Sequence, residues 1–254
     1  MLSKEQLLEQ LSRFGPWMYR FKLTDEVSTP LHAEWLAEVH ETRSRMIFPY
    51  LDAALAGRWR QVTCLDAACN EGYFAFEIGR RGAARVLGFD ARPELIEKAN
   101  FIKEFLGCSN VSFVVDDIAN LSPIRYGTFD LTLCLGLLYH LENPMDALRR
   151  IRAVTKSLCV IDTQVLRYDS TVMTCQGCKE NIFETRNVIG ILEEKDYEVN
   201  PCASITGLGF VPNRAALFTM LRYAGFSKTI QLTPPEKCFE QYATFDRIIV
   251  VAKV

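Results

Sequence analysis

The sequence lacks a long hydrophobic run and an excess of basic residues. No apolar stretch of this 254-residue chain approaches the ~18 residues that span a bilayer, and the amphipathic start MLSKEQLLEQLSRF is unlike a secretory signal. The 29 basic and 31 acidic residues give a net charge of -2. The global positive field typical of nucleic-acid-binding proteins is therefore missing. These absences disfavour a membrane partner and weigh against a large RNA partner.

A second pair of closely spaced cysteines is also lacking. Cys175 and Cys178 form one Cys-x-x-Cys pair, and only the isolated Cys202 and Cys238 could complete a four-ligand zinc site. We therefore predict no metal, while the sequence leaves open whether Cys175 and Cys178 bind one. Most other cysteines lie in apolar strand contexts, which is typical of a reducing compartment and predicts a cytoplasmic protein.

The sequence further lacks a glycine-rich phosphate-binding turn in its most informative stretch. Residues 62–90 read VTCLDAACNEGYFAFEIGRRGAARVLGFD, which predicts a strand, a turn of small residues, a helix and a second strand. A right-handed crossover makes such strands parallel. A dinucleotide site would need G-x-G-x-x-G to bind pyrophosphate. Here Asp66 precedes the turn, and a carboxylate repels phosphate and attracts a positively charged ligand.

A second acid completes this predicted site. Asp90 follows the second strand about 20 residues after the turn, where a carboxylate can accept hydrogen bonds from ribose hydroxyls. The small residues Ala67, Ala68 and Gly72 let the backbone approach a ligand closely. S-adenosylmethionine carries a sulfonium, an amine and a ribose but no phosphate. The pattern therefore predicts S-adenosylmethionine as the cofactor.

Residues 60–165 resemble the class I S-adenosylmethionine-dependent methyltransferases. LDAACNEGYF is similar to their first motif, D-x-G-x-G-x-G, with Ala68 and Asn70 replacing two glycines, and asparagine tolerates left-handed backbone. In VSFVVDDIANL, the resemblance implies that Asp117 and the amide of Ile118 contact adenine, although Asp117 could instead cap a helix. The cofactor-binding residues predicted in this way are Asp66, Ala67, Ala68, Asn70, Gly72, Asp90, Ala91, Asp117, Ile118 and Leu135.

The resemblance also implies the fold. It predicts an α/β protein with a Rossmann-like, seven-stranded, mostly parallel sheet in the order 3-2-1-4-5-7-6. Residues 1–58 are predicted to form an N-terminal helical cap, and residues 59–254 the methyltransferase domain, with an irregular, lid-like insert at about 167–210. Such caps commonly cover the cofactor. The alternative is that the aromatic residues of WMYRFKL only pack this cap onto the sheet.

The candidate catalytic residues follow the predicted fourth strand. In FDLTLCLGLLYHLENP, the loop after the strand contains Tyr139 and His140. Ligands of open parallel sheets bind outside the carboxyl ends of the strands, so this loop is expected to face the substrate. Histidine titrates where a general base must work. The alternative is that His140 only stabilises the loop, because many such enzymes act through positioning and desolvation.

Three segments indicate a narrower resemblance. NEGYFAFE, LLYHLENP and GFVPNRAALFTMLRYAGF are similar to the tRNA wobble-uridine 5-hydroxyl (carboxy)methyltransferase-like group. That group binds a carboxylated cofactor partly through an arginine, and Thr206 occupies its place here, which favours ordinary S-adenosylmethionine. We predict O-methylation of a small molecule or glycan. The alternatives are tRNA wobble-uridine modification and a non-catalytic S-adenosylmethionine-binding module. The sequence does not specify the methyl acceptor or the oligomeric state.

Overall fold

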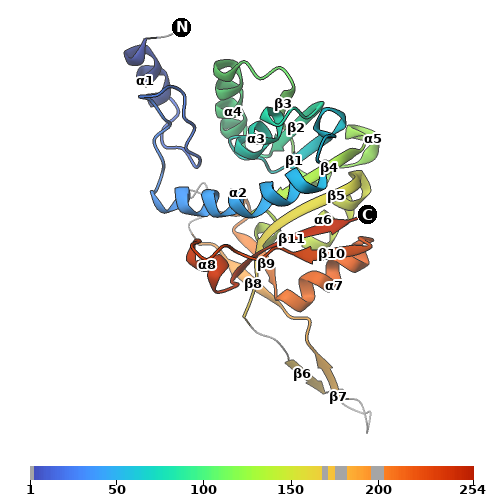
Figure 1. Cartoon of the computed structure of the whole chain (residues 1–254). Helices are drawn as coiled ribbons and strands as arrows, with labels where there is room; N and C mark the ends of the chain where they lie inside the picture. Colours follow the sequence, from blue (N-terminus) through green and yellow to red (C-terminus); the bar gives the residue numbers. More distant parts are fainter. Residues whose placement is uncertain (1–2, 168–170, 175–181, 196–202) are drawn as a thin grey trace. The chain divides into compact units, whose positions relative to one another are not determined.

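A computed structural model describes residues 3–167, 171–174, 182–195 and 203–254. It contains a seven-stranded sheet in the order β10-β11-β5-β4-β1-β2-β3 (Figure 1). Neighbouring strands are parallel in the β1-β2-β3 part and antiparallel in the β5-β11-β10 part. Numbered along the chain within this sheet, the order is 3-2-1-4-5-7-6, and the predicted fold class is confirmed. The strands are β1 (Thr63–Ala67), β2 (Arg85–Asp90), β3 (Val111–Val115), β4 (Phe129–Leu135), β5 (Thr155–Gln164), β10 (Lys228–Gln231) and β11 (Arg247–Lys253).

The predicted insert at 167–210 contains regular structure. β6 (Thr171–Thr174) pairs antiparallel with β7 (Ile182–Thr185), and β8 (Ile189–Glu193) pairs antiparallel with β9 (Leu208–Pro212). The prediction of an irregular insert is therefore wrong for these segments. Each strand has only four or five residues, and cross-strand pairing rather than local pattern stabilises such short strands. Cys175, Cys178 and Cys202 lie outside the described residues.

The chain divides into two compact units. Unit 1 comprises Met1–Asn120, Phe129–Leu133 and Thr233–Phe239, and unit 2 comprises Leu121–Thr128, Cys134–Leu232 and Glu240–Val254. The boundary predicted between residues 58 and 59 stays a prediction.

The helices of unit 1 begin and end at recognisable residues. α1 starts with a capping box in which Ser3 and Gln6 exchange side-chain and backbone hydrogen bonds. α4 has Pro93 at its first position and ends at the left-handed Gly107. α3 contacts the strands β1, β2 and β3, and α4 contacts β2 and β3 (Figure 1). The helices are α1 (Lys4–Ser12), α2 (Trp35–Ala54), η1 (Trp59–Gln61), α3 (Tyr73–Arg80), α4 (Pro93–Leu106) and η2 (Ile118–Asn120).

An extended segment joins α1 to α2. Its Trp17 forms an isolated bridge with Leu31. The side chains of Trp17, Tyr19 and Phe21 are 0%, 6% and 4% exposed, and the Phe21 ring packs edge-on against Phe76 of α3. These aromatic residues are therefore packing residues, and Phe21 packs on α3 rather than on the sheet edge. Their burial fixes the segment against the helices that flank β1. That the segment also covers the cofactor stays a prediction.

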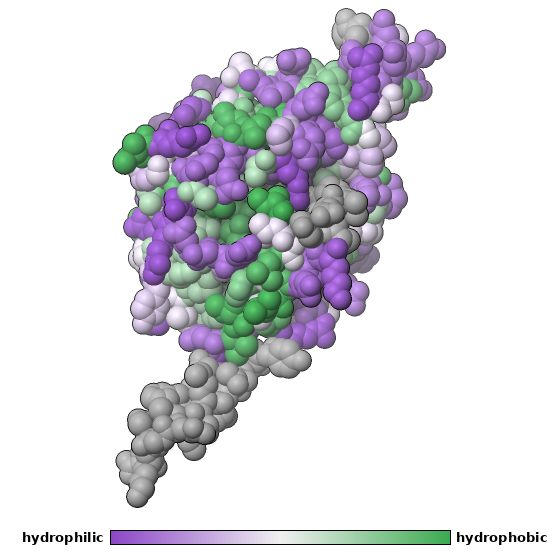
Figure 2. Space-filling view, turned by 180° about the vertical axis from the view of Figure 1, so that it is seen from behind, coloured by the Kyte–Doolittle hydropathy of each residue, from purple (hydrophilic) through white to green (hydrophobic). Residues whose placement is uncertain are grey.

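Two helices of unit 2, α6 (Pro144–Val154) and α7 (Arg214–Ala224), are capped by asparagine. The Asn143 side chain accepts from the amide of Asp146 at the start of α6, and the Asn213 side chain accepts from Ala216 in α7. On the surface, β8 exposes Ile189 and Ile191. Figure 2 shows one face of the molecule, on which hydrophobic residues gather in patches among hydrophilic ones. Among the described residues, no helix is long and apolar enough to cross a bilayer. The helices are α5 (Pro123–Tyr126), η3 (Leu138–His140), α6 (Pro144–Val154), α7 (Arg214–Ala224) and α8 (Glu240–Ala243).

Candidate functional site

The turn between β1 and α3 has an unusual backbone. Ala68, Asn70 and Gly72 adopt positive φ angles of 56°, 53° and 81°. Asparagine and glycine tolerate this region, so the predicted conformation at Asn70 is confirmed, whereas alanine adopts it at a cost of roughly 1–2 kcal/mol. Backbone strain of this kind concentrates at functional sites because the surrounding structure imposes it.

Gly72 satisfies a second constraint besides its backbone angle. A Cβ atom at this position would lie 2.5 Å from the ring of Phe113 in β3. The residue also precedes the first turn of α3 as its N-cap. Glycine therefore permits the turn to pack directly onto β3 and keeps it compact.

Asp90 at the end of β2 fixes the same turn. Its Oδ2 accepts a hydrogen bond from the amide of Asn70 at 2.9 Å, and its Oδ1 accepts from the amide of Arg92 at 3.0 Å. The residue is 7% exposed. Burial raises the pKa of Asp90, while the two backbone amides oppose that rise. A carboxylate oxygen can accept more than one hydrogen bond, so both oxygens keep capacity for ligand hydroxyls.

Asp66 lies in β1, just before the turn, and is 3% exposed. Burial raises its pKa from 3.8 to about 7, and the charge of Asp90 also raises it, while the amide of Ala75 and the charge of Arg43 lower it. Two neighbouring carboxylates in a buried environment favour a positively charged ligand, because a cation stabilises their ionised forms. Asp66 and Asp90 are thus two buried acids beside the same turn, and their joint role in cofactor binding stays a prediction.

The segment after β3 is placed next to Asp90 through its backbone. The amide of Asp116 donates to the carbonyl of Asp90 at 3.0 Å. Asp117 is half-buried, and its side chain accepts from the amide of Ala119 at 2.7 Å at the start of η2. This contact matches the capping interpretation of Asp117. Contacts of Asp117 and Ile118 with adenine stay a prediction.

The remaining predicted cofactor residues differ in exposure. Ala67 is fully buried in β1, and Ala91 is exposed directly after β2. Leu135 ends β4, is 8% exposed and belongs to unit 2. Their roles in binding stay predictions.

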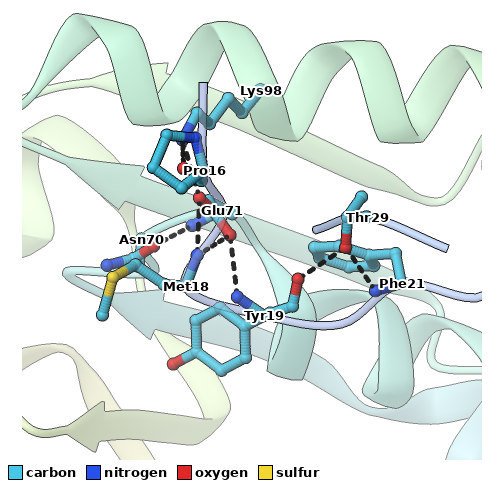
Figure 3. Close-up of polar contacts among 8 residues, drawn as sticks. All are labelled: Pro16, Met18, Tyr19, Phe21, Thr29, Asn70, Glu71 and Lys98. Carbon is cyan, nitrogen blue, oxygen red and sulfur yellow. Dashed lines mark hydrogen bonds and ion pairs between the residues drawn. The ribbon is translucent and has the colours of Figure 1, made fainter. Parts of the chain in front are cut away.

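Sequence reasoning missed Glu71, which is completely buried inside the turn. Its carboxylate accepts from the amides of Met18 and Tyr19 at 3.0 Å and from Lys98 Nζ at 3.0 Å (Figure 3). Lys98 also donates to the carbonyl of Pro16 at 2.7 Å. The available signal was a lysine on the apolar face of α4, three residues after Leu95 and one before Ala99. A cation on such a face indicates a buried partner.

In unit 2, Tyr139 belongs to a buried polar network. Its hydroxyl accepts from Arg247 Nη2 at 2.9 Å. Arg247 Nη1 pairs with Asp162 at 2.8 Å, and the Tyr242 hydroxyl donates to the other oxygen of Asp162 at 2.7 Å. Arg247 also lies over the Tyr139 ring, 5.1 Å from its centre. The network fixes the orientation of Tyr139, and its predicted catalytic role stays a prediction.

His140 is paired with a carboxylate that the sequence did not indicate. Its Nδ1 lies 3.1 Å from Oε2 of Glu194, and both side chains are 15% exposed. The amide of Ser204 donates to the same oxygen at 2.5 Å. Because a carboxylate only accepts, this contact places the proton of neutral His140 on Nδ1 and its lone pair on Nε2. No local motif marks Glu194, since 54 positions separate it from His140.

The strand β9 packs directly on the loop that contains these residues. The amide of Phe210 donates to the carbonyl of Leu141 at 3.0 Å. A Cβ atom on Gly209 would lie 2.1 Å from the carbonyl oxygen of Tyr139. Only glycine lets the two backbones approach this closely.

We expect Gly209→Ala to destabilise the protein by about 1–3 kcal/mol, because backbone must move to admit the methyl group. Thermal unfolding measures the effect. Gly190→Ala on the paired strand β8 is the control, since its Cβ would meet the flexible tip of Leu166 at 2.9 Å. Equal unfolding temperatures for the two variants would contradict the assignment of this contact.

Comparison with known families gives one match over this region. A family model described as a methyltransferase domain matches residues 60–204, which is more than half of the chain. The match includes the β1 turn, Asp90 and the loop with Tyr139 and His140.

Curated relatives are similar over most of the chain at low identity. The tRNA U34 carboxymethyltransferase of Desulforapulum autotrophicum is 24% identical over 239 residues, covering 91% of this chain and 63% of the relative. That of Campylobacter hominis is 30% identical over 132 residues, covering 52% of this chain and 42% of the relative. The chain thus spans less than two thirds of the length of these relatives.

Solved structures share the fold. The N-terminal domain of EvdMO1, solved in the presence of SAH and D-fucose, has a TM-score of 0.74 and 20% identity, covering 100% of this chain and 98% of that chain. An S-adenosylmethionine-dependent methyltransferase from Mesorhizobium loti has a TM-score of 0.58 and 16% identity, covering 84% of this chain and 100% of that chain.

Proposed function

This chain belongs to the methyltransferase-domain family, and from that premise we propose that it transfers a methyl group from S-adenosylmethionine to an oxygen atom of a small molecule or glycan. The observation that carries the proposal is the left-handed turn at 68–72, which has the buried Asp66 just before it and the buried Asp90 hydrogen-bonded to its Asn70 amide. This arrangement fits a ligand that has a cationic group and ribose hydroxyls. It disfavours a pyrophosphate ligand, because two carboxylates would repel it.

In this proposal, the residues of unit 1 bind the cofactor. Asp90 would accept from the ribose hydroxyls while its contacts with Asn70 and Arg92 persist. Asp66 would stabilise the positive charge, and Asp117 with Ile118 would contact adenine. When bound, S-adenosylmethionine supplies an electrophilic methyl group.

In the same proposal, His140 removes the proton of the acceptor hydroxyl. The contact of Nδ1 with Glu194 places the lone pair on Nε2, which is the atom that would accept the proton. The positive charge that forms on His140 would be stabilised by the carboxylate of Glu194. Tyr139, which is oriented by Arg247, would form part of the acceptor-binding wall.

Two acceptor classes have support. A sugar is favoured because the N-terminal domain of EvdMO1, which shares the fold, was solved in the presence of D-fucose. tRNA is the second candidate, because the curated relatives are tRNA U34 carboxymethyltransferases. The net charge of -2 and the neutral Thr206, which is exposed, weigh against a polyanion and against a carboxylated cofactor.

The test combines binding with transfer. We expect calorimetry to show binding of S-adenosylmethionine. In a separate assay, we expect labelled methyl groups to be transferred to at least one member of a panel of sugars and phenols. Absence of cofactor binding would overturn the proposal. Salt-dependent binding and methylation of tRNA, with no transfer to the panel, would favour the second acceptor class. Binding without transfer to any acceptor would leave a non-catalytic binding module.

We expect Asp90→Ala to weaken binding of S-adenosylhomocysteine by about 1–3 kcal/mol, because charged hydrogen bonds to the ribose and to the turn are lost. Isothermal titration calorimetry measures the change. Asp52→Ala is the control, since Asp52 forms an exposed ion pair with Arg81 in the same unit. An affinity that equals that of the control would remove Asp90 from the site.

A further inference from the structure

The buried pair of Glu71 and Lys98 anchors the extended N-terminal segment. Their side chains are 0% and 10% exposed, so water does not solvate either charge well. The carboxylate accepts from two successive amides, those of Met18 and Tyr19, and Lys98 binds the carbonyl of Pro16 (Figure 3). Undocking of residues 16–19 would therefore leave several buried polar groups without these partners, which is strongly unfavourable.

The backbone of Glu71 belongs to the turn that contains the proposed cofactor residues. The preceding Asn70 has a left-handed backbone, and its amide donates to Asp90. The Asn70 side chain in turn accepts from the amide of Glu71 at 2.8 Å. The following Gly72 is the N-cap of α3. The position of the Glu71 side chain is thus linked to the conformation of the whole turn.

Aromatic contacts join the same two parts of the molecule. The Tyr19 ring stacks on Tyr73, the first residue of α3, with centres 5.2 Å apart and planes 8° apart. Lys98 Nζ lies 5.1 Å from the centre of the Trp17 ring. The segment therefore contacts the turn through charge, hydrogen bonds and ring stacking.

We propose that Glu71 and Lys98 are positioning residues for cofactor binding, and that docking of residues 16–19 and binding of the cofactor strengthen each other through the turn at 68–72. This proposal rests on the proposed function, because it concerns the same cofactor site. Neither residue contacts the cofactor in this proposal. The docked segment stabilises the turn conformation that binds the cofactor, and thermodynamic linkage makes the effect reciprocal.

Hydrogen exchange tests the coupling in the unaltered protein. We expect saturating S-adenosylhomocysteine to slow exchange of the Met18 and Tyr19 amides about 5- to 150-fold, the range typical of coupled sites. Unchanged exchange of these amides in protein that calorimetry shows to be saturated would overturn the coupling and leave the proposed function intact. Failure of the protein to bind the ligand at all would overturn both.

A paired variant tests the residues themselves. Glu71→Gln together with Lys98→Met removes both charges and avoids leaving one of them buried alone. Without ligand, we expect the amide hydrogens of Met18 and Tyr19 to exchange faster in this variant than in the unaltered protein. We also expect the variant to bind S-adenosylhomocysteine about 5- to 150-fold more weakly. Glu26→Gln is the control, because it removes an exposed ion pair of the same segment. Faster exchange with an affinity within about twofold of the control would show a purely structural anchor and overturn the proposal.

Discussion

Replacing Asp66 with asparagine is expected to raise the free energy of unfolding at about pH 8 by about 4 kcal/mol. The native carboxyl is buried, and burial raises its pKa from 3.8 to about 7. Asparagine cannot ionise, so the folded variant avoids the penalty of a buried negative charge. Its side-chain oxygen can still accept the hydrogen bond from the amide of Ala75.

The sign of this effect defines the pH range in which it appears. The pKa of Asp66 is higher in the folded protein than in the unfolded chain, so its contribution to stability is complete below about pH 4. That contribution is lost as the pH rises through about 7. The stabilities of the native protein and the variant should therefore agree near pH 4 and diverge up to about pH 8.

Denaturant unfolding at a series of pH values measures this divergence. Asp246→Asn is the control, because Arg167 lowers the pKa of Asp246 to about 2. The contribution of Asp246 to stability is lost only as the pH falls from about 4 through about 2. The control should therefore keep the native slope between pH 4 and 8. A native protein without that slope would contradict the raised pKa of the buried Asp66.

The same substitution should weaken the cofactor complex. In the proposed function, the ionised form of Asp66 attracts the positive charge of S-adenosylmethionine. The Asp66→Asn variant should therefore be more stable than the native protein yet bind this cofactor less tightly. The loss of affinity should be larger above pH 7. Such an opposition between stability and binding is common at functional sites. Equal affinity of both proteins at high pH would place the cationic group elsewhere.

Replacing His140 with alanine should lower the turnover number by about 10²- to 10⁴-fold, the usual contribution of a general base. The affinity for S-adenosylhomocysteine should change little, because the proposed cofactor residues of unit 1 are untouched. Initial rates of methyl transfer and calorimetry measure the two quantities separately. Unchanged turnover would restrict His140 to stabilising its loop.

Glu194→Gln tests the partner of His140. The amide can keep a hydrogen bond but removes the negative charge that would stabilise protonated imidazole, so methyl transfer should slow while the affinity for S-adenosylhomocysteine changes little. Initial rates of methyl transfer and calorimetry measure these two quantities. Glu193→Gln is the control, since Glu193 is the exposed neighbour on β8. Equal transfer rates for the two variants would rule out Glu194 as the electrostatic partner of His140.

Local pattern predicted the central elements closely. The apolar runs VSFVV and FDLTLCL form the strands β3 and β4, because runs of apolar residues between turn signals specify buried strands. The helix ends at Pro93, Gly107 and Gly225 follow from backbone preferences of single residues. These features depend on neighbours within a few positions.

Pairing over long distances was not predictable in this way. β8 and β9 are short and lie in a segment expected to be irregular. Their pairing depends on contacts across 15 or more positions, for example Glu193 with Leu208, and on the close approach of Gly209 to Tyr139. A single sequence carries no local signal for such contacts.

The sequence by itself determined the strands β1 and β2, the turn after β1 and the acids Asp66 and Asp90 at the ends of these strands, while the order of the whole sheet was implied by the family resemblance. The tertiary structure alone decided the partners of buried charges: Lys98 and two backbone amides for Glu71, and His140 for Glu194. The physical reason is the separation along the sequence between the interacting groups. Secondary structure follows from the conformational preferences of nearby residues, whereas the partner of a buried charge is whichever group the completed packing brings within hydrogen-bonding distance.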